Sequence, residues 1–165
     1  MNSERRAVVC DVPLYAQHRT NLCWAYCIIM REEYLDHPDG GFASQDEADA
    51  RARALSAATY EGKSRRRRYN HSGRVPADDA GVPASVDALV DLLEKHGPVF
   101  GIFHAWFWNH CVLVTGADAD TDTVYVNDPH GKRLTMTWAQ FLKGRGLSRL
   151  FRYRLLRIRV PRKSE

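Results

Sequence analysis

A cysteine marks the point where a polar loop gives way to a long apolar run. Cys23 follows the polar residues 18–21 and opens the segment CWAYCIIM, which predicts a helix from about Leu22 to Leu35. A thiol attacks a carbonyl group only as its thiolate, and a helix N-terminus and a nearby imidazolium both stabilise that form. The position therefore suits a nucleophile. It is also typical of a buried structural thiol, because free cysteine is among the most buried residue types.

An activated thiol needs a histidine that is distant in sequence and near in space. Of the seven histidines, four stand in predicted polar loops or at the end of a predicted helix: His18, His37, His71 and His96. His110 directly precedes CVLVTG, an apolar segment typical of a strand, so its side chain would extend from a rigid element. His110 is therefore the predicted general base and acid.

The other parts of such a site are also present in order along the chain. A catalytic imidazole needs a partner on its second ring nitrogen. The predicted strand TVYVND ends in Asn127 and Asp128, and a hairpin would bring either residue beside His110, although Asn-Asp-Pro is also ordinary turn chemistry. Acyl transfer further needs hydrogen-bond donors to the oxyanion. The backbone N–H of Cys23 is one candidate, and the side-chain amide of Gln17 is the second.

Helical patterns fill the first half of the chain and strand patterns the second. Besides the cysteine helix, helices are predicted from Ser44 to Gly62 and from Ser85 to Gly97, each with a serine cap and a glycine stop. Residues 63–83 are polar and basic, which indicates a loop. Strands are expected before Pro13 and at 99–106, 111–118, 123–128, 133–141 and 150–160, the last with a bulge at Leu155–Leu156. The pattern predicts a single α+β domain over residues 1–165, with helices facing an antiparallel sheet.

The composition narrows the classes of function. The net charge of +4, from 24 basic and 20 acidic residues, is too small to imply a nucleic-acid partner. The four cysteines are too few for a disulfide scaffold. Zinc on Cys23, Cys27, His110 and Cys111 is disfavoured, because the spacing of the first two is poor and adjacent strand residues point to opposite faces. No metal or other cofactor is expected.

The apolar segments also bear on location. None approaches the roughly 20 residues of a membrane span, and the N-terminus lacks the apolar core of a signal peptide. We therefore expect synthesis in the cytoplasm, and export, where it occurs, by a route without a cleaved signal. The basic run Arg65–Arg68 fits a solvated loop best. Its functional readings are steering of an acidic substrate or a cleavage site in a precursor.

The segments VPLYAQHRTNLCWAY, LLEKHGPVF, HCVLVTGA and VYVNDPHG together resemble the papain-like cysteine peptidases. The chain is most similar to compact bacterial members, which include secreted effector proteases and the peptidases that cut double-glycine leader peptides. The resemblance covers roughly residues 10 to 30 and 85 to 142, and residues 38–84 match nothing in it. It implies a papain-like fold in which the nucleophile helix packs against the sheet.

Carried over, the resemblance makes Cys23 the nucleophile, His110 the base and acid, Asp128 the orienting residue and Gln17 the oxyanion donor. Papain itself uses asparagine as the third member, which keeps Asn127 as an alternative. The predicted substrate contacts are Trp24, Trp108 and Asn109, with ordinary packing as the competing interpretation of the tryptophans.

The function expected from these residues is hydrolysis of peptide or isopeptide bonds through a thioester acyl-enzyme. The partners are a protein or peptide substrate and, for a secreted bacterial effector or toxin, a secretion-system component or an immunity protein. Two alternatives stay open. The same triad would serve a transglutaminase, a deamidase or a peptidoglycan amidase, and the fold would also serve an inactive binding module.

Overall fold

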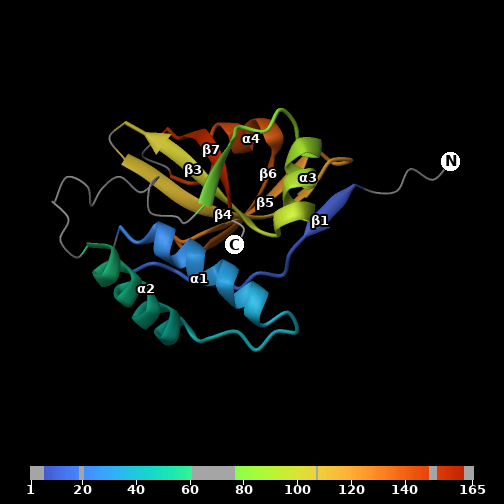
Figure 1. Cartoon of the computed structure of the whole chain (residues 1–165). Helices are drawn as coiled ribbons and strands as arrows, with labels where there is room; N and C mark the ends of the chain where they lie inside the picture. The colour runs from blue at the N-terminus through green and yellow to red at the C-terminus, as the bar shows by residue number, and fades with distance from the viewer. Residues whose placement is uncertain (1–5, 19–20, 61–76, 107, 149–151, 162–165) are drawn as a thin grey trace.

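In the computed structural model, residues 6–18, 21–60, 77–106, 108–148 and 152–161 are described. They form one antiparallel sheet with helices on both faces (Figure 1). The strand order is β2-β7-β3-β4-β5-β6, and β1 pairs with β4 outside this path. The strands are β1 (Ala7–Val9), β2 (Ala77–Gly81), β3 (Val99–Ala105), β4 (Trp108–Asp118), β5 (Thr123–Asp128), β6 (Lys132–Thr137) and β7 (Arg154–Pro161). The helices are α1 (Cys23–Asp36), α2 (Gln45–Tyr60), α3 (Val86–His96) and α4 (Trp138–Leu142).

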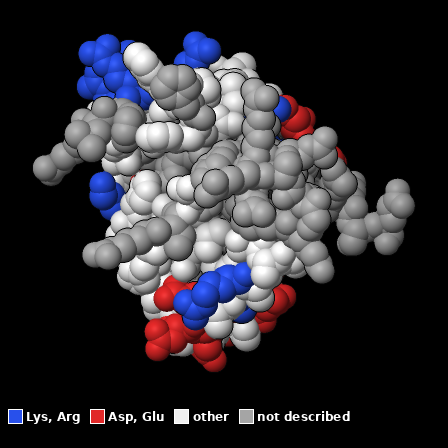
Figure 2. Space-filling model, turned by 90° about the vertical axis from the view of Figure 1, so that its left-hand side faces the viewer, with Lys and Arg blue, Asp and Glu red and all other residues white. Residues whose placement is uncertain are grey.

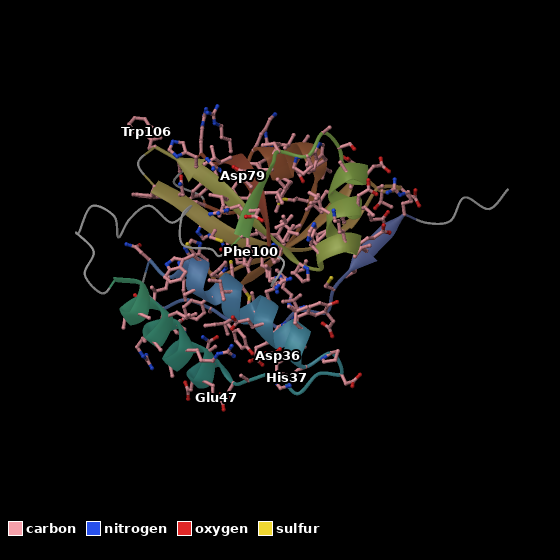
Figure 3. All side chains as sticks on the ribbon, viewed as in Figure 1. Asp36, His37, Glu47, Asp79, Phe100 and Trp106 are labelled. Carbon is pink, nitrogen blue, oxygen red and sulfur yellow. The ribbon has the colours of Figure 1, made fainter. Side chains whose placement is uncertain are left out.

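Two hydrophobic cores lie on opposite faces of the sheet. The first joins α1 and α2 to side chains of β3 and β4, among them Phe100, which Figure 3 shows between α1 and the sheet. The second joins α3 and Phe141 of α4 to the other face, including Val112 and Val114. The α+β class and the packing of the cysteine helix against an antiparallel sheet are thus as predicted.

α1 is buried on nearly all sides because it lies between the sheet and α2. Every residue from Cys23 to Met30 is buried. A helix that contacts solvent on one side shows an apolar stripe, whereas this helix is apolar around its first two turns. The nucleophile candidate therefore sits on a rigid, central element.

The remaining helix ends follow from short-range signals. Ser44 and Glu47 exchange hydrogen bonds before α2, with Ser44 N–H donating to Glu47 at 2.7 Å. The Ser85 side chain accepts a hydrogen bond from Ala88 N–H, and Gly97 ends α3 with a φ of 67°. Because α3 packs against β4, these caps help to fix the strand that carries His110.

The structure corrects two of the predicted elements. Residues 138–142 were predicted to continue a strand, but they form α4, because Thr137 and Gln140 make a capping box that starts a helix. Ala77–Gly81 was predicted as loop, but it pairs with β7 as an edge strand. The rest of that predicted loop, with Arg65–Arg68, lies outside the described residues.

The bulge predicted in the last strand is confirmed. Ile102 of β3 faces Arg157, whereas the next residue, Phe103, faces Leu155. Leu156 is therefore the extra residue, and the bulge restores the alternation of apolar and basic residues on the two faces of β7.

Candidate active site

The nucleophile candidate is the first residue of α1. Leu22 occupies the N-cap position without a side-chain hydrogen bond, and the first turn carries no acidic residue. The N-cap side chain therefore does not engage the N–H groups of this turn, and the positive end of the helix dipole is not offset by a carboxylate of the same turn. Cys23 is buried at 3% exposure, so this polarity acts on its sulfur with little screening by water.

Two sulfur atoms of α1 hold the backbone of the residue that follows His110. Cys111 N–H donates to Cys23 Sγ at 3.4 Å, and Cys27 Sγ donates to Cys111 O at 3.5 Å. Because residues four apart lie on one helix face, a single turn of α1 contacts both backbone polar groups of one residue, Cys111. This arrangement sets the nucleophile helix in register with β4. Burial and the neighbouring Cys111 raise the pKa of the Cys27 thiol well above its usual value, so Cys27 stays protonated and serves packing.

His110 connects the cysteine with the end of β5. Its Nε2 lies 2.8 Å from Asp128 Oδ1, and its side chain also hydrogen-bonds Cys23, which leaves Nδ1 as the nitrogen for the sulfur. Burial would lower the pKa of His110, but the hydrogen bonds to Asp128 and Cys23 outweigh it and raise the pKa to about 9. Imidazolium is therefore the favoured form at neutral pH.

Asp128 is buried and stays ionised. Burial would raise its pKa, but hydrogen bonds from His110 and His130 hold the pKa well below its usual range. The hairpin brings the end of β5 beside β4, with Leu113 facing Asn127. Cys23, His110 and Asp128 are thus brought together, from α1, β4 and β5, at the end of the molecule where α1 begins (Figure 1).

Asn127, the alternative to Asp128, points elsewhere. Its side-chain amide donates to Pro13 O at 3.0 Å and to Val12 O at 3.3 Å, within the buried interior. It therefore anchors the N-terminal segment to β5, and within the described part of the chain the imidazole of His110 bonds to Asp128 instead. The geometry favours Asp128 as the partner of the imidazole.

Gln17 lies in a segment that is held from two sides. Its backbone N–H donates to Pro129 O at 2.6 Å, and the preceding residue, Ala16, exchanges two hydrogen bonds with the Gln45 side chain at 2.9 Å each. The side-chain oxygen Oε1 is buried and has no hydrogen-bond partner among the described residues. The backbone of Gln17 therefore lies next to the turn after Asp128, and the group of its side chain that could donate to an oxyanion is Nε2.

A second histidine, His130 in the turn after β5, stacks on His110. The rings of His110 and His130 lie 4.6 Å apart at an angle of 9°. His130 also contacts Asp128 Oδ1 twice, through its backbone N–H at 3.0 Å and its Nδ1 at 3.3 Å. These contacts raise the pKa of His130. The only sequence signal was its place two residues after Asp128.

The three residues predicted to contact substrate lie in different surroundings. Trp24 is buried at 1% exposure, because the first turn of α1 turns this ring into the core, which favours packing; contact of Trp24 with substrate stays a prediction. Trp108 is 42% exposed, and its indole N–H donates to the hydroxyl group of Tyr153 at 3.3 Å. Asn109 Oδ1 lies 3.0 Å from His104 Nδ1, on the neighbouring strand. Tyr153, which was not predicted, is buried with its ring 5.8 Å from that of His110.

The same cluster bears on metal binding. Ligand atoms of His110, Asp128 and His130 lie within 4.8 Å of one another, and within the described ranges this is the group close enough to surround an ion. However, Asp128 Oδ1 already accepts hydrogen bonds from both histidines, so hydrogen bonding alone accounts for the cluster.

Among the described residues, no helix has the length and apolar character that crossing a membrane requires.

Comparison with known proteins agrees with this geometry. Residues 7–144 match the family described as papain-like cysteine protease AvrRpt2. The matched region contains α1, the strands β4 and β5, and the segment with Gln17. No curated protein matches the chain. Since the match covers most of the sequence, the chain belongs to the papain-like cysteine protease AvrRpt2 family and is a cysteine peptidase.

Proposed function

We propose that the chain hydrolyses peptide or isopeptide bonds with Cys23 as nucleophile, His110 as base and acid, and Asp128 as the orienting residue. The observation that carries this proposal is the unbroken series of contacts from Cys23 through His110 to Asp128, at the uncapped start of α1. In this series each group has the neighbour that its role requires.

Before the reaction, the proton of Cys23 Sγ resides on His110 Nδ1 as a thiolate–imidazolium pair, and in the first step the thiolate attacks the carbonyl carbon of the substrate. Asp128 stabilises the imidazolium, and the Cys111 N–H stabilises the sulfur anion. The carbonyl oxygen becomes an oxyanion, for which the Cys23 N–H and the Gln17 amide are the proposed donors.

In the second step, the tetrahedral intermediate collapses to a thioester and the C–N bond breaks. His110 Nδ1 gives its proton to the leaving amine, so that the imidazole is neutral again. The same nitrogen then takes a proton from water, which attacks the thioester. The acid is released with the Cys23 thiolate as leaving group, and the proton stays on His110, which restores the thiolate–imidazolium pair.

Alkylation tests the proposal directly. At neutral pH, Cys23 is expected to react with iodoacetamide at least about tenfold faster than a model thiol, because the imidazolium beside it favours the thiolate. His110→Ala should remove this advantage. Peptide mapping identifies the labelled cysteine, and the buried Cys27 serves as the internal control. Labelling at the rate of a model thiol, unchanged in His110→Ala, would contradict the proposal and favour the inactive binding module.

The products distinguish peptide hydrolysis from the other reactions of such a triad. Hydrolysis gives two fragments whose masses sum to the substrate plus one water, deamidation replaces an amide by an acid within one chain, and cross-linking releases ammonia. Family membership favours the first result. Mass spectrometry of a protein substrate treated with the wild type and with Cys23→Ala separates the three.

The contact between His130 and the triad predicts an unusual acid limb in the pH profile. Protonation of His130 places a second positive charge against His110 and shares the Asp128 carboxylate between the two rings, with Lys132 as a further cation nearby. The thiolate–imidazolium pair of Cys23 and His110 is then weakened. Since the pKa of His130 is raised, kcat/KM should begin to fall while the pH is still near neutral.

The measurement compares the wild type with His130→Phe, which keeps a ring on His110 and removes the titrating group. The variant should lose several-fold less kcat/KM than the wild type between about pH 8 and about pH 6. His37→Phe, at the exposed far end of α1, is the matched control and should follow the wild type. Parallel profiles for His130→Phe and the wild type would show that His130 only packs against the triad.

The site of action is a separate proposal. The similarity to compact bacterial effector proteases supports export of the chain as an effector or toxin, by a route without a cleaved signal. The chain should then appear in the medium of intact producing cells, with a cytoplasmic marker retained in the pellet. Retention of both in the pellet would contradict export.

A further inference from the structure

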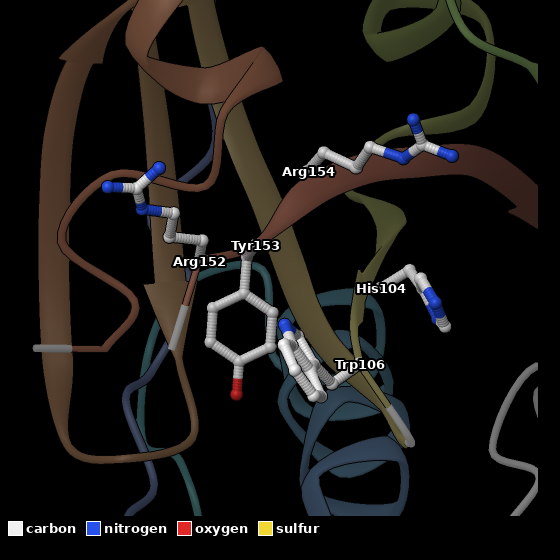
Figure 4. A pocket seen from close by; sticks show the side chains of 5 residues that line it. All are labelled: His104, Trp106, Arg152, Tyr153 and Arg154. Atoms are coloured by element: carbon white, nitrogen blue, oxygen red, sulfur yellow. The ribbon is translucent and has the colours of Figure 1, made fainter. Parts of the chain in front are cut away.

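An open hollow of about 450 Å³ lies beside the proposed triad. It is lined by His104, Trp106, Arg152, Tyr153 and Arg154 (Figure 4). His104 and Arg154 face each other across β3 and β7, and Trp106 follows the end of β3. Trp106 is 80% exposed and has a φ of 39°, so the chain displays a large aromatic side chain at the rim. The hollow thus combines aromatic surface with basic groups.

One residue joins the hollow to the catalytic histidine. Tyr153 lines the hollow, and its ring lies 5.8 Å from the ring of His110. Its hydroxyl accepts a hydrogen bond from Trp108, which fixes the ring in place. A substrate that runs past His110 on the side of Tyr153 therefore reaches the hollow next.

The arginines of this region differ in how their charges are satisfied. Arg157 forms an ion pair with Asp79 at 2.9 Å, and Arg159 donates to Ala77 O. Arg152 and Arg154 are exposed, and within the described ranges neither has an ion pair. The edge strand β2 thus accounts for the first two guanidinium groups. Arg152 and Arg154 line the hollow, and Figure 4 shows their side chains extending in different directions on either side of Tyr153.

The surface around the hollow can be compared with it for the distribution of charged side chains. Figure 2 looks at the end of the molecule where α1 begins. Lys and Arg appear toward the top and left of this view, and Asp and Glu gather mainly at the bottom, on the side of α2, where they surround a further Lys or Arg group. A negative group on the substrate is therefore attracted to the sheet side of the site.

The chemistry of the proposed reaction indicates which part of the substrate lies near the hollow. His110 must protonate the leaving nitrogen, so the part of the substrate that leaves as an amine lies on the His110 side of the cleaved bond. Tyr153 and the hollow lie beyond His110 on that side. The hollow is thus placed for a side chain downstream of the cleaved bond.

We propose that this hollow is a specificity subsite that binds an acidic side chain, Asp or Glu, on the leaving-amine side of the substrate. Arg152 and Arg154 supply the charge for the carboxylate, because guanidinium groups pair with carboxylates through two parallel hydrogen bonds. Trp106 and Tyr153 cover the apolar part of the side chain. The direction along the substrate rests on the proposed function, whereas the preference for acid does not.

Binding tests the subsite independently of catalysis. A randomised peptide library is passed over the immobilised full chain carrying Cys23→Ala, and the bound fraction is sequenced. Asp and Glu should be enriched about fivefold over Asn and Gln at low salt, and less at high salt. Adding Arg152→Gln and Arg154→Gln should abolish the enrichment. Arg53→Gln with Arg145→Gln, two exposed arginines that do not line the hollow, should leave it unchanged.

Two results would overturn the subsite: equal retention of acids and amides, or equal loss of enrichment in the control variant, which would indicate only net charge. The wild-type chain is then given the same library, and the new N-termini of the products are sequenced. Acidic residues should follow the cleaved bond. An uncut library would count against the proposed function while leaving the binding result in force, so the two failures are distinguishable.

Discussion

Cys23→Ala is expected to abolish peptide hydrolysis, lowering kcat/KM by at least about a thousandfold, whereas Cys27→Ala should keep most of it. The two cysteines stand one turn apart on α1, both are buried, and both contact the backbone of Cys111. Only Cys23 also contacts His110 by a side-chain hydrogen bond. Comparing the two variants therefore distinguishes the loss of a nucleophile from the loss of a packed side chain within the same helix.

The measurement is kcat/KM on a cleaved protein substrate, together with urea unfolding of each variant. Cys27→Ala should lose about 1–2 kcal/mol of unfolding free energy, since it removes a buried sulfur from the α1–β4 contact. Equal loss of activity in the two variants, with both folded, would instead indicate a shared metal or disulfide role.

Asp128→Asn is expected to lower kcat/KM by roughly 10²- to 10⁴-fold with little change in shape. The substitution keeps the size of the side chain and removes the charge that stabilises the His110 imidazolium. The pKa of His110 should fall toward its ordinary value, which NMR titration of the labelled imidazole measures. A pKa that stays near 9 would mean that Asp128 is not the group responsible.

Asn127→Ala is the matched comparison, and it should act on stability first. The substitution removes the donor to Val12 O and Pro13 O. Val12 O keeps a hydrogen bond from Arg133 at 3.1 Å, whereas the carbonyl of Pro13 loses its partner. A loss of about 1–3 kcal/mol in unfolding free energy is expected. Where the variant is folded, the pKa of His110 should be unchanged. A lowered pKa in Asn127→Ala, with Asp128→Asn unaffected, would reverse the assignment of the third residue.

The sequence could predict the parts that depend on local patterns. The spacing of serine and glycine residues predicts the caps of α2 and α3, and the break in the alternation of apolar and basic residues predicts the bulge in β7. The serine caps and the bulge are present in the structure. The order of Gln17, Cys23, His110 and Asp128 also narrowed the candidates for the site. What order alone left open was which side chain of the Asn127–Asp128 pair turns toward the imidazole.

The features that were missed depend on distant packing. The burial of Trp24 follows from the position of α1 between α2 and the sheet, which its own sequence does not contain. The stacking of His130 on His110 needs the exact closure of the turn after β5, and Tyr153 reaches the site only because β7 pairs with β3. α4 is different, because its Thr-x-x-Gln signal was present but was outweighed by β-branched neighbours.

The sulfur contacts between α1 and Cys111 have a consequence for how the enzyme fails. The nucleophile Cys23 lies on helix α1 and its base His110 on strand β4. At Cys111, α1 and β4 are joined by hydrogen bonds to sulfur, which are weak. A small slide of the helix along the strand separates thiol from imidazole while both layers stay intact. Warming or mild denaturant should therefore abolish catalytic activity before the circular dichroism signal changes. Loss of turnover is then the earliest sign that the helix layer and the sheet have moved apart.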